Sequence, residues 1–551
     1  MSERRTAPGD VRLASSLLLL RDGEQGLEVL MLRRAERDGD MRSGAVVFPG
    51  GVLDARDREA HGLVLGPSDE EASERLGVTA GGLDYYVAAL RESFEEVGLL
   101  LATPTPTPAR LAALQPWRAR LQAGTASIAE LCRAEQLELD ANSLAAYSHW
   151  LTPPGVPQRF DTRFFAALAP AGQVAVPDRG EAVELMWLAP RDALDTRREL
   201  KLLPVTRRTL QELARFGRAD DAYGEARTRR DIPLVMPRRV ASPRGTLRVV
   251  LPDELAYAEV ARLDPEGRGD ITADLGPGRA VRLSANIVRV TAPNSGPMTG
   301  PGTNSYLVGD GLSWTAIDPG PAMPEHVRAL LDAAAPGRIE RILVTHTHRD
   351  HSPAAPMLAQ ATGAPVYGRR TAHPEWQDAS FQPARELTDG ERLILAPGVT
   401  LRVLHTPGHA SNHLCYLFEE EKLLFTGDHV MQGSTVVINP PDGDMTAYLR
   451  ALEALLAIDL EWFAPGHGFL VARPHDVLRA LIAHRLRREA KVADALRAAG
   501  TASIDEMLPS VYDDAPAALH PVARRSLLAH LLKLAAEGRA VEEGQHWIWR
   551  G

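Results

Sequence analysis

The sequence predicts an α/β protein of several domains, and three observations support this prediction. The chain has 551 residues, and a typical size of roughly 150 residues per domain suggests two to four domains. Short apolar runs mix with turns and helix-like segments through the first half of the chain. From Ser284 onward, strand-like and helix-like segments alternate regularly, which favours sheets covered by helices.

Composition and charge narrow the choice of partners and location. The net charge of −10 gives no overall attraction to nucleic acid or to an anionic membrane. The two cysteines, Cys132 and Cys415, are far apart and match no zinc spacing, so we expect no disulfide and a cytoplasmic location. No stretch is long and apolar enough to span a bilayer, and we interpret the apolar run near the N-terminus as a first strand.

Residues 1–280 are predicted to form the first domain. "LEVLMLRR" and "SGAVVFPGG" are typical of strands. "GLDYYVAALRESFEEVG" has helical spacing and ends at Gly98. Pro, Arg and Gly become frequent between Asp231 and Arg279, and this shift in composition indicates a domain junction near residues 277–283.

Three carboxylates share one face of the predicted helix, because Glu92, Glu95 and Glu96 stand at positions i, i+3 and i+4. They repel one another unless a positive group holds them, and Mg²⁺ or Mn²⁺ prefers such oxygen ligands. Arg91 is the side chain that could hold one of them in place. A solvated acidic helix face is the alternative interpretation.

The acidic helix and the upstream "VVFPGGVLDA" together resemble a Nudix box, a glycine-containing loop followed by R-E-x-x-E-E-x-G. Gly51 and Arg91 are 40 positions apart, and the insert leaves the first glutamate of the box without a match. An insertion of this kind, with "RFDTRFF" and "LPDELAY", resembles the Nudix subgroup of peroxisomal coenzyme A diphosphatases. Glu181 or Glu184, before Trp187, is considered as a further carboxylate.

The Nudix resemblance implies an α/β/α sandwich and a Mg²⁺- or Mn²⁺-dependent diphosphatase. Its substrate would be a coenzyme A-like or nucleotide-like diphosphate. Glu92, Glu95 and Glu96 would then be catalytic metal ligands. A degenerate binding module is the alternative for this domain.

A second chemical signal is "THTHRDHS", which begins at Thr345 directly after the apolar run "RILV". Turns that follow later apolar runs supply more metal-capable side chains. The full set of candidate ligands comprises His346, His348, Asp350, His351, His409, Asp428 and His467. Imidazole and carboxylate together suit Zn²⁺, and loops at strand ends are where α/β proteins build their sites.

These side chains sort by chemistry into two zinc sites joined by Asp428, namely His346, His348 and His409 for one ion and Asp350, His351 and His467 for the other. A water between two zinc ions ionises near neutral pH and can attack a carbonyl carbon or a phosphorus. We assign Asp350 a catalytic role in addition to metal binding.

"HTHRDH" with its later GH, GD and GHG turns resembles the metallo-β-lactamase superfamily. The upstream "GPMTGPGTNSYLVGDG" and "TAIDPG" resemble its β-lactamase-like protein 2 and glyoxalase II members. The resemblance implies a binuclear zinc hydrolase with an αββα sandwich over residues 281–474. It leaves two substrates open, because such proteins cleave thioesters or single-stranded RNA. Asp318 is expected to support a metal ligand, Asn304 is considered for the site lining, and His405 and His413 are expected to be structural.

Residues 475–551 are predicted to form a small winged-helix module. From Leu481 onward the chain carries ten Lys or Arg and nine Asp or Glu residues. Only "RLRREAK" is a basic cluster, so a module that packs on the sandwich or forms a homodimer is favoured over one that binds RNA. The complete prediction is a bifunctional hydrolase acting on small diphosphate and thioester or ester substrates, with RNA cleavage as the alternative.

Overall fold

A computed structural model describes residues 11–36, 43–177, 182–242, 247–376 and 378–551. The chain divides into two compact units. The first comprises Met1–Pro252 with Glu266–Asp270, and the second comprises Asp253–Pro265 with Ile271–Gly551. Finer domain boundaries at residues 280 and 474 stay a prediction.

The strands and helices of the first unit alternate in short segments. Its strands are β1 Val11–Gly23, β2 Gly26–Arg34, β3 Val46–Val47, β4 Gly50–Val52, β5 Val64–Leu65, β6 Ala102–Thr103, β7 Glu138–Asp140, β8 Ala145–Leu151, β9 Arg159–Leu168, β10 Ala182–Leu188, β11 Leu234–Val235, β12 Arg238–Ala241 and β13 Leu247–Val250. Its helices are α1 Asp69–Leu76, α2 Gly82–Val97, α3 Pro108–Ala113, α4 Gln115–Gln122, α5 Ile128–Glu135, α6 Pro190–Leu194, α7 Pro204–Leu213 and α8 Ala219–Thr228.

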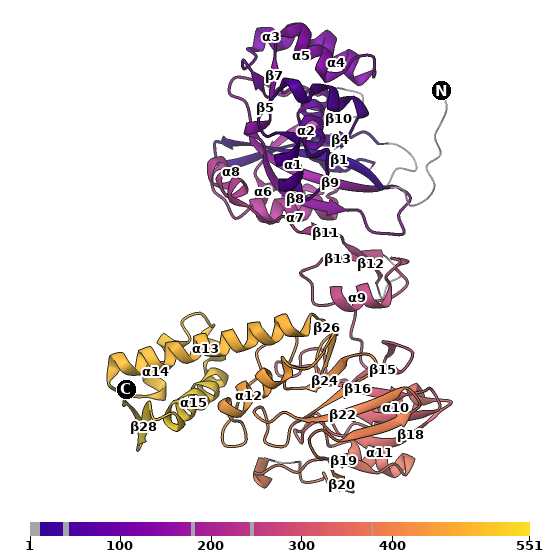
Figure 1. The fold of residues 1–551 in the computed structure, drawn as a ribbon, viewed down its shortest axis with the longest axis vertical. Helices are drawn as coiled ribbons and strands as arrows, with labels where there is room; N and C mark the ends of the chain where they lie inside the picture. Colours follow the sequence, from indigo (N-terminus) through magenta and orange to yellow (C-terminus); the bar gives the residue numbers. More distant parts are fainter. Residues whose placement is uncertain (1–10, 37–42, 178–181, 243–246, 377) are drawn as a thin grey trace. The chain divides into compact units, whose positions relative to one another are not determined.

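A mixed sheet forms the centre of the first unit, in the order β10-β2-β1-β9-β8-β11, with β3 on β2 and β4 on β1 (Figure 1). Because side chains alternate along a strand, β1 serves two cores. Leu17 and Leu19 pack in the core that contains α2, whereas Leu18 and Leu20 pack in the core that contains α7 and α8. Helices therefore cover both faces, which confirms the predicted α/β/α sandwich.

Helix α2 ends where the sequence predicts. Gly98 adopts a left-handed φ of 70°, and its N–H donates to the Phe94 carbonyl at 3.1 Å. Upstream, the insert between Gly51 and Arg91 folds into the 3₁₀ helix η1 (Ala55–Leu63), β5 and α1. Strand β5 joins a separate small sheet in the order β5-β7-β6.

The second unit contains the remaining elements. Its strands are β14 Ala280–Arg282, β15 Ile287–Thr291, β16 Asn304–Gly309, β17 Ser313–Ile317, β18 Arg338–Leu343, β19 Val366–Gly368, β20 Arg385–Glu386, β21 Arg392–Ala396, β22 Val399–His405, β23 Leu414–Phe418, β24 Leu423–Gly427, β25 Trp462–Pro465, β26 Val471–Ala472, β27 Thr501–Ser503, β28 Ala540–Glu543 and β29 His546–Trp549. Its helices are α9 Tyr257–Leu263, α10 Pro324–Ala334, α11 Ala355–Thr362, α12 Met445–Leu455, α13 Pro474–Ala499, α14 Ile504–Val511 and α15 His520–Ala536.

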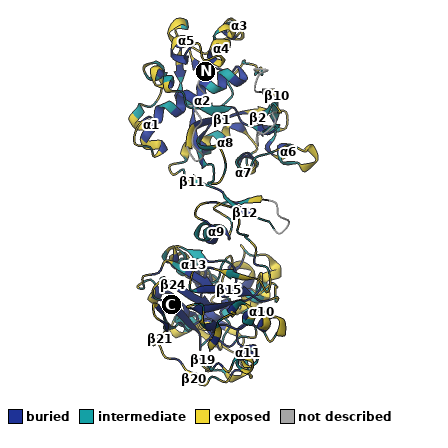
Figure 2. Ribbon diagram, turned by 90° about the vertical axis from the view of Figure 1, so that its right-hand side faces the viewer, coloured by how far each residue is buried: buried dark blue, intermediate teal, exposed yellow. Residues whose placement is uncertain are grey.

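Two sheets face each other in the second unit, one running from β14 to β20 and the other from β21 to β26 in chain order. Their inner faces share one core, in which the rings of Tyr306 and Phe425 lie 5.0 Å apart. Helices α10 and α11 pack on the outer face of the first sheet, and α12 and the start of α13 pack on that of the second. This arrangement confirms the αββα sandwich, and Figure 2 shows the buried interior around β15 and β24.

The last part of the chain forms a small helical module with the three-stranded sheet β27-β29-β28. Helix α13 joins it to the sandwich. Leu478 on this helix packs in the core beneath the second sheet, whereas Val492 and Leu496 pack in the core of the C-terminal module. The structure therefore places the module against the sandwich.

The cysteines and the longest helices bear on the expectation of no disulfide and no membrane span. Cys132 and Cys415 are both buried free thiols. No helix within the described residues is long and apolar enough to cross a membrane.

Candidate metal centres

The structure brings all seven histidine and aspartate candidates of the second unit together. They lie in loops that follow strands β18, β22, β24 and β25. Their donor atoms form two groups, and within each group all atoms lie within 4.8 Å of one another. The groups are His346, His348 and His409, and Asp350, His351, Asp428 and His467.

In the first group, Nδ1 of His348 lies 3.0 Å from Nε2 of His346 and 3.0 Å from Nε2 of His409. Burial lowers the pKa of His346 well below its usual value, and the neighbouring His351 lowers it further. Burial and His409 lower the pKa of His348 to about 4. These two rings are therefore neutral at pH 7, which is the form of histidine that binds a metal.

In the second group, Nε2 of His351 and Nε2 of His467 each face Asp350 and Asp428 at 3.3–3.4 Å. Within the described residues, the two Nε2 atoms and Oδ1 of Asp428 are buried and make no hydrogen bond. Buried polar atoms without partners are rare in proteins. Their convergence fits a cation that would satisfy all of them at once.

The charges around the second group also fit a cation. Burial lowers the pKa of His467, but Asp428 and Asp350 outweigh this effect and raise it to about 10. His351 behaves similarly, because its three carboxylate neighbours outweigh burial and raise its pKa well above the usual value. The carboxylates thus favour positive charge here, and a metal ion would replace the protons. Asp428 also lies 3.8 Å from Nε2 of His409, between the two groups.

Three of the candidate ligand histidines are oriented by a partner on Nδ1, the nitrogen that faces away from the site. Nδ1 of His351 donates to Asp318 at 2.9 Å, so the role expected for Asp318 fits this geometry. Nδ1 of His409 donates to the Val437 carbonyl at 2.8 Å, and Nδ1 of His467 donates to the Gly302 carbonyl at 3.1 Å. The sequence analysis did not find the two carbonyl partners, because any residue type can supply a backbone oxygen.

Glycine in the "GHG" turn is required by close packing. A Cβ at Gly466 would lie 2.6 Å from Oδ1 of Asp428 and 2.8 Å from Cε1 of His351. Asn304 is buried and donates to the carbonyls of Pro465 and Gly468 at 3.1 and 2.8 Å. Asn304 therefore holds this turn in place rather than lining the site.

His405 and His413 lie outside both donor groups, as expected. Nε2 of His413 accepts a hydrogen bond from the backbone N–H of Asp428 at 3.2 Å, and His405 bonds to the Ser411 carbonyl at 3.1 Å. Both rings therefore support loops of the site.

The acidic cluster of the first unit is centred on Arg91, which is buried on α2. Its guanidinium donates to Asp57 at 2.7 and 3.1 Å, to Glu92 at 2.8 Å and to Glu95 at 3.2 Å. Asp57 lies on η1 in the insert, and the sequence analysis missed it. Glu96 bonds separately to the backbone N–H of Gly50 at 2.8 Å.

These carboxylates are crowded. Burial and the charge of Glu95 raise the pKa of Glu92 to about 7, against the opposing effect of Arg91, and burial also raises the pKa of Glu95. A Cβ at Gly51 would lie 2.3 Å from Oε1 of Glu92, so only glycine allows this approach. A cluster that disfavours its own negative charge fits a divalent cation. Glu184 points elsewhere and pairs with Arg33 at 2.9 Å, and Glu181 lies outside the described residues.

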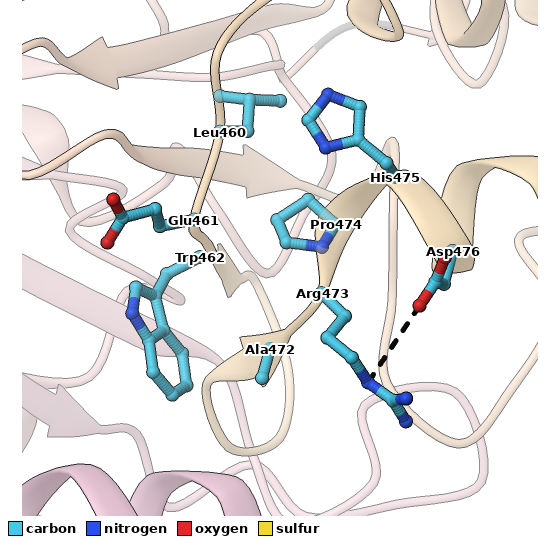
Figure 3. A pocket seen from close by; sticks show the side chains of 8 residues that line it. All are labelled: Leu460, Glu461, Trp462, Ala472, Arg473, Pro474, His475 and Asp476. Atoms are coloured by element: carbon cyan, nitrogen blue, oxygen red, sulfur yellow. Dashed lines mark ion pairs between the residues drawn. The ribbon is translucent and has the colours of Figure 1, made fainter.

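A separate cavity of about 460 Å³ lies beside the β25–β26 hairpin and the start of α13 (Figure 3). Trp462 and His475 line it, as do Arg473 and Asp476, which pair with each other at 3.9 Å. None of the seven donors lines this cavity. The chemistry of the second unit is therefore assigned to the loops at the strand ends.

The fold and the donor groups define a metal-dependent hydrolase, and comparisons with known families agree. Residues 298–467 match the family model for the metallo-β-lactamase superfamily. Residues 68–215 match the NUDT19 Nudix domain, and residues 503–549 match the β-lactamase associated winged helix domain. The chain belongs to the metallo-β-lactamase superfamily and carries a Nudix domain fused to it.

The chain is also similar to individual known proteins. Lactamase-like protein aptB of Emericella nidulans is 31% identical over 47% of this chain and 84% of its own length. An atrochrysone carboxyl ACP thioesterase of Aspergillus chevalieri is 31% identical over 49% of this chain and 87% of its own. Among solved structures, a NUDIX hydrolase from Alicyclobacillus acidocaldarius is 29% identical, with a TM-score of 0.34, over 40% of this chain and 97% of its own.

Proposed function

We propose that the second unit is a binuclear zinc thioesterase acting on acyl groups carried by coenzyme A or by an acyl carrier protein. The observation that carries this proposal is the convergence of seven donors into two groups, with Asp428 near both. Histidine and carboxylate donors without cysteine are typical of catalytic zinc sites. Two zinc ions would supply Lewis acidity and a water that ionises near neutral pH.

The surrounding residues would prepare the site for hydrolysis. Asp318, Val437 and Gly302 hold the Nδ1 protons of three histidines, which directs each Nε2 lone pair into the site. Oδ2 of Asp350 faces the histidines. Its other oxygen would accept the proton of the attacking water, while the thiolate of the substrate leaves without needing protonation.

Two observations favour a thioester over RNA. A relative that matches over most of its own length is named an acyl carrier protein thioesterase. The basic cluster of the C-terminal module is also unsuited to binding a phosphate backbone. Arg485 and Arg488 are buried, and Lys491 pairs with Asp513 on the surface.

For the first unit we propose a Mg²⁺- or Mn²⁺-dependent diphosphatase acting on a coenzyme A-like diphosphate. Glu92 and Glu95 on α2 would contact the metal, and Glu96 would join them by releasing Gly50. Arg91 would hold the first two carboxylates at their present positions. The match to the NUDT19 Nudix domain and the resemblance to coenzyme A diphosphatases support this substrate class.

One panel of substrates tests both halves of the proposal. The purified full chain, loaded with zinc and supplied with Mg²⁺, is incubated with acyl-coenzyme A, free coenzyme A and labelled single-stranded RNA. We expect thiol release that His348→Ala abolishes and diphosphate cleavage that Glu95→Gln abolishes. RNA cleavage that is sensitive to His348→Ala, without thiol release, would replace the thioesterase proposal with a ribonuclease.

A further inference from the structure

Two buried arginines on α13 make the same two kinds of contact, a hydrogen bond to a valine carbonyl and a contact with a tyrosine ring, but in different parts of the second unit. Arg485 donates to the Val436 carbonyl, and its guanidinium lies 5.3 Å from the ring centre of Tyr448. Arg488 donates to the Val511 carbonyl, and its guanidinium lies 4.2 Å from the ring centre of Tyr512. Arg488 thus serves the C-terminal module, whereas Arg485 reaches into the sandwich.

The segment that Arg485 contacts also carries the partner of a metal-ligand candidate. The carbonyl of Val437, the next residue after Val436, accepts the hydrogen bond from Nδ1 of His409 at 2.8 Å. Residues 433–438 belong to no helix or strand, and none of them makes a backbone–backbone hydrogen bond with the rest of the described chain. The orientation of the Val437 carbonyl therefore depends on side chains that hold this segment.

Tyr448 connects Arg485 to the loops that carry Asp428 and His409. Its hydroxyl donates to the His429 carbonyl at 3.1 Å, directly after Asp428 in the chain. Its backbone packs against Gly408, where a Cβ would lie 2.4 Å from the Cα of Tyr448. Gly408 immediately precedes His409. The Arg485–Tyr448 contact thus lies behind two of the proposed ligands.

We propose that Arg485 is a positioning residue for His409, acting through the Val436–Val437 backbone and Tyr448. The C-terminal module is then part of the framework of the first metal group, because its connecting helix supplies the side chain that fixes this segment. This inference rests on the proposed metal binding, and it does not depend on which substrate the site hydrolyses.

The test compares Arg485→Met with Arg488→Met in the full-length protein. Both variants remove a buried arginine from α13 that lies over a tyrosine ring and donates to a valine carbonyl, and Arg488→Met additionally removes an ion pair with Asp514 at 2.9 Å. Each protein is loaded with Zn²⁺ and dialysed against graded concentrations of a chelator, and retained zinc is counted. Loss of a partner that orients a metal ligand typically weakens metal binding about 10- to 100-fold. We expect Arg485→Met to bind one of its two zinc ions more weakly by this factor, and Arg488→Met to bind both zinc ions as the parent does.

A second readout follows the site directly. Co²⁺ replaces Zn²⁺, and the visible absorption of the bound Co²⁺ reports ligand geometry. We expect a changed spectrum in Arg485→Met, the parent spectrum in Arg488→Met, and partial recovery in Arg485→Lys, which keeps a donor for the Val436 carbonyl. If Arg485→Met does not fold, Arg485→Lys is compared with the parent. Its spectrum should then differ from that of the parent, because lysine keeps a donor for the Val436 carbonyl but loses the guanidinium over Tyr448, and an unchanged spectrum would overturn the inference.

Three results would overturn the inference. One is equal zinc retention in both methionine variants, and another is a Co²⁺ spectrum unchanged by Arg485→Met. The third is a parent protein that binds fewer than two metal ions. A parent that binds two zinc ions but hydrolyses no thioester refutes the proposed function alone, and the metal-retention comparison still decides the role of Arg485.

Discussion

Oδ2 of Asp318 lies 2.9 Å from Nδ1 of His351, and both side chains are buried. The same carboxylate accepts hydrogen bonds from the backbone N–H and the hydroxyl of Thr345, each at 2.7 Å. Asp318 therefore connects the end of β17 to the loop that carries the first histidines. It also fixes which nitrogen of His351 is available to a metal.

Asp318→Asn tests this relationship. Asp318 has a φ of 51°, which asparagine tolerates, so the backbone should keep its conformation. The amide keeps the size of the side chain but loses the charge that favours a proton on Nδ1 of His351. We expect about 10- to 100-fold weaker binding of the second zinc ion, measured by chelator competition.

Asp310→Asn is a suitable control for this prediction. Asp310 is also a turn aspartate of the second unit, and its carboxylate accepts from the backbone N–H groups of Leu312 and Ser313. It contacts neither donor group. Equal zinc affinity in Asp318→Asn and Asp310→Asn would show that Asp318 does not orient the ligand.

The seven metal-ligand candidates were predictable because each is a side chain of a distinctive type in a turn after an apolar run. The chemistry of the residues is local in the sequence. Their convergence is not, because the loops follow β18 of the first sheet and β22, β24 and β25 of the second. The two sandwich folds were predictable through the resemblance of these motifs to the Nudix and metallo-β-lactamase families. Continuous apolar runs such as Leu17–Leu20 on β1 indicate only that a strand is buried on both faces.

Other parts of the sites have no such local signal. Asp57 reaches Arg91 only because η1 folds back from a long insert, and no fixed spacing relates the two residues. Arg485 and Arg488 belong to a run of basic residues that is typical of an exposed patch. They are three positions apart, so they share a helix face, and that face is the buried one. Burial of a charged side chain depends on tertiary contacts that sequence patterning does not report.

Asp57→Asn tests the contribution of the insert to the first site. Asp57 is buried and bonds through both oxygens to Arg91, which in turn holds Glu92 and Glu95. Removing this charge leaves the buried guanidinium free to draw more strongly on the two glutamates. We expect a raised Mg²⁺ concentration for half-maximal diphosphatase activity and a rate reduced by at least about 10-fold.

Asp84→Asn provides the matched control, because Asp84 also pairs with basic side chains, Arg58 and His61, near the start of α2. It makes no contact with Arg91. If Asp57→Asn needs the same Mg²⁺ concentration for half-maximal activity as the parent, Asp57 has no positioning role.

His326 predicts a specific pH dependence of stability. Burial lowers its pKa from 6.5 to about 4, against a small opposing effect of Glu325, and its Nε2 bonds to the Ser305 hydroxyl at 2.8 Å. Between these two pH values the unfolded chain takes up a proton on this ring and the folded chain does not. The free energy of unfolding therefore falls as pH drops below 6.5, by about 2 kcal/mol at about pH 5 from this group.

His326→Gln should remove that part of the pH dependence, because glutamine does not titrate. Urea unfolding of parent and variant at about pH 5 and about pH 7.5 measures the difference. His373→Gln, at a partly exposed position, is the control and should follow the parent. An identical loss of stability on acidification in parent and His326→Gln would contradict this assignment.

Gly466→Ala separates site geometry from fold stability. A methyl group there would lie 2.6 Å from Oδ1 of Asp428 and 2.8 Å from Cε1 of His351, so both side chains must move. The backbone at Gly466 has no left-handed φ, so alanine itself is not strained. Gly276→Ala is the control in the same unit, since its nearest neighbour, Oδ2 of Asp274, would be 3.8 Å from the added carbon. We expect Gly466→Ala to lose zinc and thioester hydrolysis while its far-ultraviolet circular dichroism stays that of the parent. A Gly466→Ala protein that keeps two zinc ions at parent affinity would show that Asp428 and His351 do not share a metal.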